Sequence, residues 1–157
     1  MLVFLKFNLI QIMKLKLLLF TAAALVGAVS SLAADKIVGG PKGGRLLEAD
    51  GQRAEFFVTP DRKVEITFYD AALKPVAPGD QVVTVTAEPK AGRAKLDLEK
   101  TSTGYISKAA LPEGDPYRVV VQLRAKADAK PQNFRVDFNL ETCGECKRAE
   151  YACTCDD

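Results

Sequence analysis

The residue types with the clearest chemistry in this sequence are four cysteines, all within its last fifteen residues. They follow the pattern C-x2-C-x6-C-x-C and are Cys143, Cys146, Cys153 and Cys155. Four thiolates can enclose one ion in a tetrahedral zinc site, or bind a soft ion such as copper(I). Gly144 is expected to allow the bend within the first pair, and Lys147 and Arg148 to favour the ionised thiol of Cys146. The spacing therefore predicts a thiolate metal site holding zinc or copper(I).

The same cysteines have two other interpretations. Outside the cytoplasm an even number of cysteines favours disulfides, and a bridge within the C-x-C pair would be strained. Each cysteine of the first pair would then join one of the second, so that two disulfides clasp the tail. In a third interpretation Cys143 and Cys146 form a redox pair, although that motif normally opens a helix in a thioredoxin-like fold. The choice between metal and disulfides stays open at this level.

One residue type that much protein chemistry uses is absent, and another is confined to the N-terminal residues. The sequence has no histidine, and its two methionines, Met1 and Met13, lie close to the N-terminus. Histidine-based triads, histidine general bases and histidine metal sites are therefore excluded. Thiolates, carboxylates and backbone oxygens remain as ligands.

The N-terminal residues have the pattern of a cleavable signal peptide. Lys14 and Lys16 precede an apolar run over residues 17–29, and small residues at Ser31 and Ala33 predict cleavage after Ala33. A membrane anchor is the alternative, but the apolar core is shorter than the ~20 residues that a spanning helix needs. Met13 heads a more compact signal than Met1 and is the expected start. We therefore expect residues 1–33 to be removed and the protein to be periplasmic or secreted, with no stable membrane span.

The charge of the remaining chain is nearly balanced. Without residues 1–33 the chain keeps 19 basic and 20 acidic residues, and no long run of one sign remains. A basic patch or stripe is what nucleic acids and anionic membranes attract. We therefore expect neither as a partner; a metal ion or a protein of the cell envelope is the expected partner.

Alternating apolar and polar residues predict an all-β domain over residues 45–141. The clearest strands are expected at 63–69, 83–87, 95–99, 118–124 and 134–140, and weaker ones at 45–49, 54–59 and 105–109. Turn residues separate these runs, and their spacing is typical of an antiparallel sandwich. The prediction is an immunoglobulin-like β-sandwich of about seven to eight strands. Residues 34–44 are expected to be a flexible, glycine-rich lead-in, and residues 142–157 a cysteine-rich tail.

One tyrosine supports the immunoglobulin-like class. Tyr117 follows the turn Leu111 to Pro116 and begins a strand, which resembles the tyrosine corner of such sandwiches. Its hydroxyl is expected to bind the backbone of the preceding turn.

A short glycine-rich motif also has a resemblance to known proteins. The segment from Gly40 to Leu46, GPKGGRL, resembles a motif of exported bacterial proteins connected with heavy-metal handling, including the N-terminal segments of periplasmic adaptor subunits of metal efflux pumps. The third residue of that motif is usually His, and here it is Lys42, which cannot bind metal while protonated. With its Cys-rich ending, the chain also looks like a group of small uncharacterised exported proteins. The resemblance implies a role in metal handling.

These observations predict a binding or accessory module and no enzyme. Glu65, Glu88 and Asp97 fall at strand positions expected to face solvent, so no catalytic residue is predicted. The leading hypothesis is metal buffering or delivery through the four cysteines. The alternative is a structural or protein-interaction sandwich whose tail is stapled by two disulfides.

Overall fold

The computed structural model describes residues 36–155. The signal peptide, its cleavage after Ala33 and the expected start at Met13 fall outside the described residues. Between residues 36 and 155, no helix combines the length and hydropathy required to cross a membrane.

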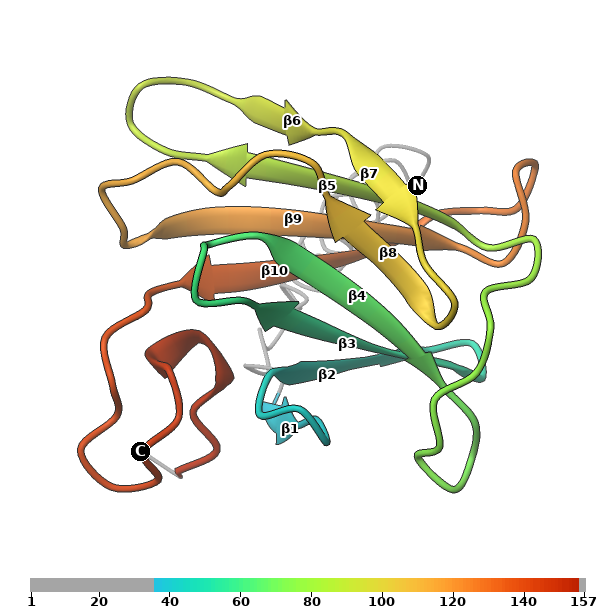
Figure 1. Ribbon diagram of the computed structural model, residues 1–157, viewed down its shortest axis with the longest axis horizontal. Helices are drawn as coiled ribbons and strands as arrows, with labels where there is room; N and C mark the ends of the chain where they lie inside the picture. The colour runs from blue at the N-terminus through green and yellow to red at the C-terminus, as the bar shows by residue number, and fades with distance from the viewer. Residues whose placement is uncertain (1–35, 156–157) are drawn as a thin grey trace, which may run out of the picture. The chain divides into compact units, whose positions relative to one another are not determined.

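The described chain forms two antiparallel sheets (Figure 1). A six-stranded sheet has the order β1-β2-β3-β4-β8-β7, and a four-stranded sheet has the order β10-β9-β5-β6. The strands of the first are β1 (Val38–Gly39), β2 (Arg45–Ala49), β3 (Gln52–Val58), β4 (Val64–Tyr69), β8 (Gly104–Ser107) and β7 (Leu98–Lys100). Those of the second are β10 (Gln132–Phe138), β9 (Tyr117–Arg124), β5 (Val82–Glu88) and β6 (Ala94–Leu96). The predicted all-β class is therefore confirmed.

The core lies between the two sheets and is built by the predicted alternation. Every second residue of β9 is buried, as expected of a strand with one face on a core. The six-stranded sheet contributes Leu47, Ala54, Phe56, Val58, Val64, Ile66 and Phe68 to one hydrophobic cluster, and the four-stranded sheet contributes Val85, Ala87, Leu96, Val119, Val121, Leu123, Val136 and Phe138. The arrangement is sandwich-like.

The strand count differs from the prediction because one expected strand divides between the sheets. Residues 95–99 were predicted as a single strand, but β6 pairs with β5 and β7 pairs with β8. The change occurs at Asp97, whose carbonyl accepts the Lys108 N–H at 2.9 Å. With β1 added, the described residues contain ten strands instead of seven or eight.

The expected flexible lead-in instead belongs to the sheet. Val38 and Gly39 form β1 and pair with β2. The following residues 40–44, here called the glycine strap, lie over the outer face of the six-stranded sheet and bind the fully buried Glu55. Thr67 and Tyr69 of β4, which alternate with the core residues of that strand, are also buried on the outer face. The outer face of this sheet is therefore partly covered.

The tyrosine corner is confirmed by its hydrogen bond. The Tyr117 hydroxyl donates to the Pro112 carbonyl oxygen at 2.7 Å. Arg62 donates to the same oxygen at 2.7 Å and to the Asp115 carboxylate at 3.1 Å. The other Asp115 oxygen accepts the Leu140 N–H at 3.1 Å. The corner therefore fixes the point at which the chain leaves β10 and enters the cysteine tail.

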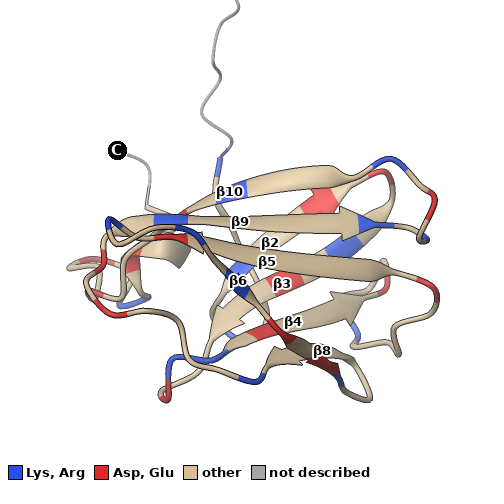
Figure 2. Ribbon diagram, turned by 90° about the horizontal axis from the view of Figure 1, so that it is seen from above, with Lys and Arg blue, Asp and Glu red and all other residues tan. Residues whose placement is uncertain are grey.

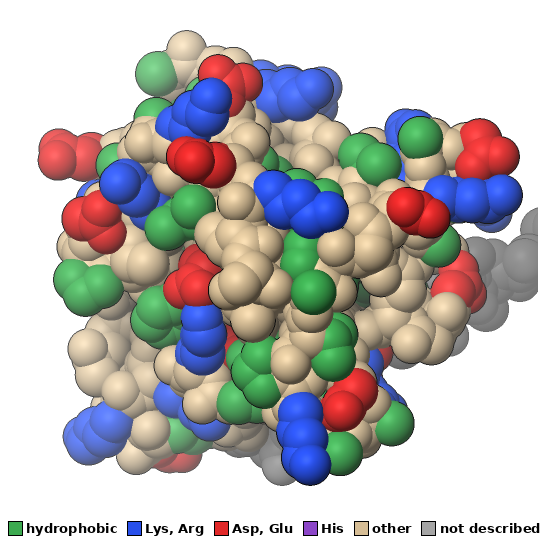
Figure 3. Space-filling model, turned by 45° about the vertical axis from the view of Figure 1, so that its right-hand side comes forward, with side chains coloured by type: hydrophobic (Ala, Val, Ile, Leu, Met, Phe, Trp, Pro, Cys, Tyr) green, Lys and Arg blue, Asp and Glu red, His purple; other side chains and the backbone are tan. Residues whose placement is uncertain are grey.

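Charged residues of both signs are distributed over the two sheets and their loops (Figure 2). On the four-stranded sheet, Arg118 faces Asp137 at 3.7 Å and Arg93 pairs with Glu88 at 2.9 Å. On the face shown in Figure 3, acidic and basic groups alternate with scattered hydrophobic ones. The visible faces thus present mixed charge.

Candidate metal centre

The first cysteine pair lies in a small hairpin that follows β10. Thr142 and Ala149 form an antiparallel bridge, and the Cys143 N–H donates to the Arg148 carbonyl oxygen at 2.8 Å. The turn closes where the Lys147 N–H donates to the Cys143 carbonyl oxygen at 3.2 Å. The residue of this turn in the left-handed region is Lys147, with a φ of 60°. Gly144, which was expected to allow the bend, does not have a positive φ.

A short 3-10 helix, η1 (Glu150–Ala152), then turns the chain so that the second cysteine pair returns to the first. The helix is anchored in the sandwich core by Tyr151. The Tyr151 hydroxyl accepts the Val58 N–H at 3.0 Å, and its ring meets Phe56 edge-on with centroids 5.4 Å apart. Ala152 is fully buried beside it. The tail is therefore a packed part of the domain. This packing was not among the features predicted from the sequence.

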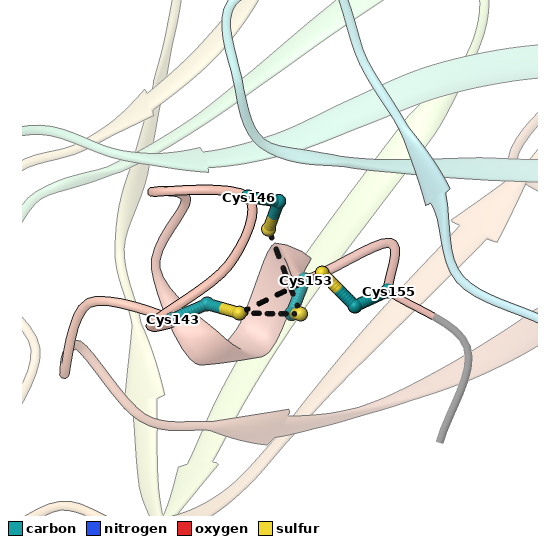
Figure 4. A group of neighbouring side chains, drawn as sticks. All are labelled: Cys143, Cys146, Cys153 and Cys155. Atoms are coloured by element: carbon teal, nitrogen blue, oxygen red, sulfur yellow. Dashed lines mark hydrogen bonds between the residues drawn. The ribbon is translucent and has the colours of Figure 1, made fainter.

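This folding brings all four predicted ligands together (Figure 4). Their Sγ atoms all lie within 4.8 Å of one another. The measured separations are 3.0 Å for Cys143 and Cys153, 3.6 Å for Cys146 and Cys153, and 3.8 Å for Cys143 and Cys155. Within residues 36–155, this quartet is the group of His, Cys, Asp or Glu ligands close enough to hold a metal ion.

The sulfur separations come close to those around a single tetrahedral ion, except that the Cys143 and Cys153 sulfurs are nearer to each other, at 3.0 Å. A Zn–S bond of about 2.3 Å in a regular tetrahedron places neighbouring sulfurs about 3.8 Å apart. Two of the three measured separations, 3.6 and 3.8 Å, fall close to that value. An iron–sulfur cluster would spread the thiolates over several metal atoms and hold them further apart. A disulfide needs about 2.05 Å, and no cysteine pair is at that distance.

The backbone around the cluster favours one ionised thiolate. The N–H groups of Arg148 and Thr154 point at the Cys146 sulfur and lower its pKa to about 6. The Lys147 and Arg148 side chains were expected to cause this effect, but the backbone amides cause most of it. Charged thiolates so stabilised are the form that binds metal.

The sulfurs of Cys153 and Cys155 resist losing their protons because they lie so close to other thiols. A hydrogen bond with Cys143 raises the pKa of Cys153, and one with Cys153 raises the pKa of Cys155. Several thiolates within 4.8 Å repel one another unless a cation compensates them. The arrangement is therefore one in which metal binding would release protons.

The exposure of the four cysteines is unequal. Cys143 is buried with 6% of its surface exposed, and the other three are partly exposed. One side of the cluster is thus closed by the domain, and the other can be reached from solvent.

The glycine strap has a structural role that explains its composition. The N–H groups of Lys42 and Gly44 donate to Glu55 at 2.9 and 2.7 Å, and the Tyr69 hydroxyl donates to it at 2.7 Å. A Cβ atom at Gly40 would lie 2.2 Å from the Glu55 carboxyl carbon. The Lys42 ammonium pairs with Glu65. The strap therefore wraps a buried carboxylate, and the residues that carried the resemblance to metal-handling proteins serve this contact.

Searches of protein-family models, curated proteins and solved structures found no match to this chain.

Proposed function

We propose that this protein is an exported, non-catalytic binding module whose C-terminal thiolates hold one metal ion, for metal buffering or delivery outside the cytoplasm. The observation that carries the proposal is the convergence of four sulfurs within 4.8 Å, although they come from two separate turns. Bringing four thiols this close desolvates and crowds them, which a bound cation compensates. The expected export signal and the resemblance of residues 40–46 to metal-handling proteins agree with this role.

Zinc is the ion that the geometry supports best. Tetrahedral four-sulfur coordination is typical of zinc, whereas Cu(I) is selected by soft thiolate and thioether ligands without that requirement. The sulfur separations of 3.6 and 3.8 Å support the tetrahedral case. Copper(I) remains the second ion to be tested, because all four ligands are soft thiolates.

The fold is proposed to be a variant of the immunoglobulin-like sandwich. The tyrosine corner at Tyr117 and the two antiparallel sheets support that assignment. Sandwiches of this kind serve many functions, so the fold alone does not decide the activity. In this proposal the sandwich is a scaffold that holds the cysteine hairpin rigidly and presents it to a protein of the cell envelope.

The test is a metal titration of the exported protein, purified with its thiols reduced. We expect one zinc ion per chain, release of protons on binding, and loss of binding in Cys143→Ser, which removes the buried ligand. Gly144→Ala is the matched control, because a Cβ atom there meets nothing within 4 Å. A wild-type protein that binds no zinc and no copper(I) under these conditions would refute the proposal.

The second candidate is a structural or interaction module clasped by two disulfides. The separations of 3.8 Å for Cys143 and Cys155 and 3.6 Å for Cys146 and Cys153 would let these two pairs close after a small movement. Each bridge would need an oxidant to accept two electrons and two protons. Intact mass before and after reduction distinguishes this state, because two bridges lower the mass by about four hydrogens.

A further inference from the structure

One side chain connects the cysteine hairpin to the N-terminal edge of the six-stranded sheet. The Arg148 guanidinium donates to the Gly44 carbonyl oxygen at 3.5 Å. It also lies against Gly39, where an added Cβ atom would be only 2.5 Å from the Arg148 Nη1 atom. Glycine at position 39 therefore leaves the space that the guanidinium fills.

The backbone of the same residue belongs to the candidate metal centre. The Arg148 carbonyl oxygen accepts the Cys143 N–H at 2.8 Å, and the Arg148 N–H points at the Cys146 sulfur. Both contacts depend on the conformation that the hairpin takes when its sulfurs converge. Ordering of the hairpin by a metal ion would thus fix the base of the Arg148 side chain.

The segment that Arg148 touches begins with a very short strand. Strand β1 has two residues and pairs with β2 through Val38 with Leu46 and Gly39 with Arg45. So short a strand is weakly held by its ladder alone. The strap that follows is closed by the Gly40 N–H bond to the Gly44 carbonyl at 2.8 Å, the same oxygen that Arg148 contacts.

We propose that metal binding at the four cysteines locks β1 and the glycine strap onto the sheet through Arg148, and that metal loss loosens them. This inference rests on the proposed metal site and adds a regulated element to it. Both ends of the described chain meet at this site, so the metal state of the C-terminal hairpin controls the order of the N-terminal segment. When β1 is released, the backbone of β2 becomes the edge of the six-stranded sheet.

Hydrogen–deuterium exchange on the full chain, loaded with zinc or stripped with a chelator, tests the lock. The reporting amides are those of Gly40, Lys42, Gly43 and Gly44, all of which donate hydrogen bonds within the strap or to Glu55. We expect about tenfold slower exchange of these amides in the zinc-loaded protein, because the guanidinium contact adds a charge-assisted hydrogen bond. Peptides from β9, in the other sheet, should show no difference.

Two variants separate the lock from the metal site. Arg148→Ala removes the guanidinium, and Gly39→Ala displaces it without changing any residue of the hairpin. In both variants the strap amides should exchange at the same rate with and without zinc. Gly39→Ala, which leaves the cysteine hairpin unaltered, should still bind one zinc ion. Arg93→Ala, which removes an arginine that is 80% exposed on the other sheet, should behave as wild type.

The outcomes distinguish the two proposals. Zinc binding with equal strap exchange in the loaded and stripped wild type overturns the lock and leaves the metal site standing. Failure of the wild type to bind zinc, established by metal analysis of the same samples, overturns the metal site and the lock with it. Zinc-dependent protection that survives in both Arg148→Ala and Gly39→Ala contradicts the route through Arg148.

Discussion

Tyr151 is the residue on which docking of the cysteine tail to the sandwich depends, and its hydroxyl can be removed with little change of shape. The Tyr151→Phe substitution keeps the ring between Phe56 and Phe138 and deletes only the acceptor of the Val58 N–H. Both groups of that hydrogen bond are buried. A buried N–H left without a partner costs about 1–3 kcal/mol, so the variant should lose about 2 kcal/mol in its free energy of unfolding.

Tyr105→Phe provides the matched control. Its hydroxyl donates to the Gln81 carbonyl oxygen at 2.7 Å in a partly buried setting, where water can replace the lost donor. That variant should lose only about 0.5–1 kcal/mol. Urea unfolding of the wild type and both variants, with zinc at one fixed concentration, gives the three free energies.

One result of this series would contradict the proposed role of the Tyr151 hydroxyl. If Tyr151→Phe is as stable as the wild type, or loses no more than Tyr105→Phe, the tail is not held to the core by this hydrogen bond. Tyr151→Ala extends the series, since it removes the ring as well and should cost about 3–5 kcal/mol. A small loss in that variant would mean that the tail folds independently of the sandwich.

Three further predictions concern other parts of the molecule. Gly40→Ala should destabilise the protein by about 1–3 kcal/mol in urea unfolding, because its Cβ would lie 2.2 Å from the Glu55 carboxyl carbon; Gly144→Ala, which meets nothing within 4 Å, should change little. Burial alone would raise the pKa of Asp115. Its hydrogen bonds, including those from the Leu140 N–H and Arg62, have the larger combined effect and leave the pKa below its usual value. The stability that this lowered pKa contributes is complete above the unfolded pKa of about 3.9 and is lost as the pH falls through the folded pKa. The wild type should therefore be more stable than Asp115→Asn at neutral pH and lose this difference in free energy of unfolding in that acidic range. A difference that grows on acidification would contradict this. Free zinc at about 100 times its dissociation constant should raise the free energy of unfolding by about 2.7 kcal/mol, and excess chelator should abolish the gain; an unchanged melting temperature would show that zinc binds no folded site.

The sequence predicted most of the strands because burial on one face imposes a period of two. The runs around β4, β5, β9 and β10 are found close to their expected places. Tyr117 was also assigned correctly, since a tyrosine corner depends on local sequence within one turn. Local periodicity and local turn chemistry carried this part of the prediction.

Features that depend on long-range contacts were not predictable in this way. Tyr69 is buried with its hydroxyl bonded to Glu55, the carboxylate that the strap, more than twenty residues earlier in the chain, also binds. The strand expected at 95–99 divides at Asp97 because each half finds its partner in a different sheet. The alternation of residues within one strand predicts neither the burial of an outer face nor the division of a strand between two sheets.

The metal centre shows the same division between local and long-range information. The spacing of the cysteines predicted a set of possible ligands, and the structure places all four sulfurs close enough together to hold a metal ion. The anchor Tyr151 was missed, although an aromatic residue between two cysteine pairs was a usable signal. The pKa of Cys146 was assigned to the wrong groups, because backbone N–H directions follow from the hairpin fold and not from charged neighbours in sequence.

Native mass spectrometry of the export-processed protein, combined with a thiol count, addresses the central assignment most directly. We predict a chain carrying one zinc ion, with four reactive thiols appearing once the metal is removed at acidic pH. A metal-free chain lighter by about four hydrogens, without reactive thiols, would contradict the metal assignment and establish the tail as a pair of disulfides.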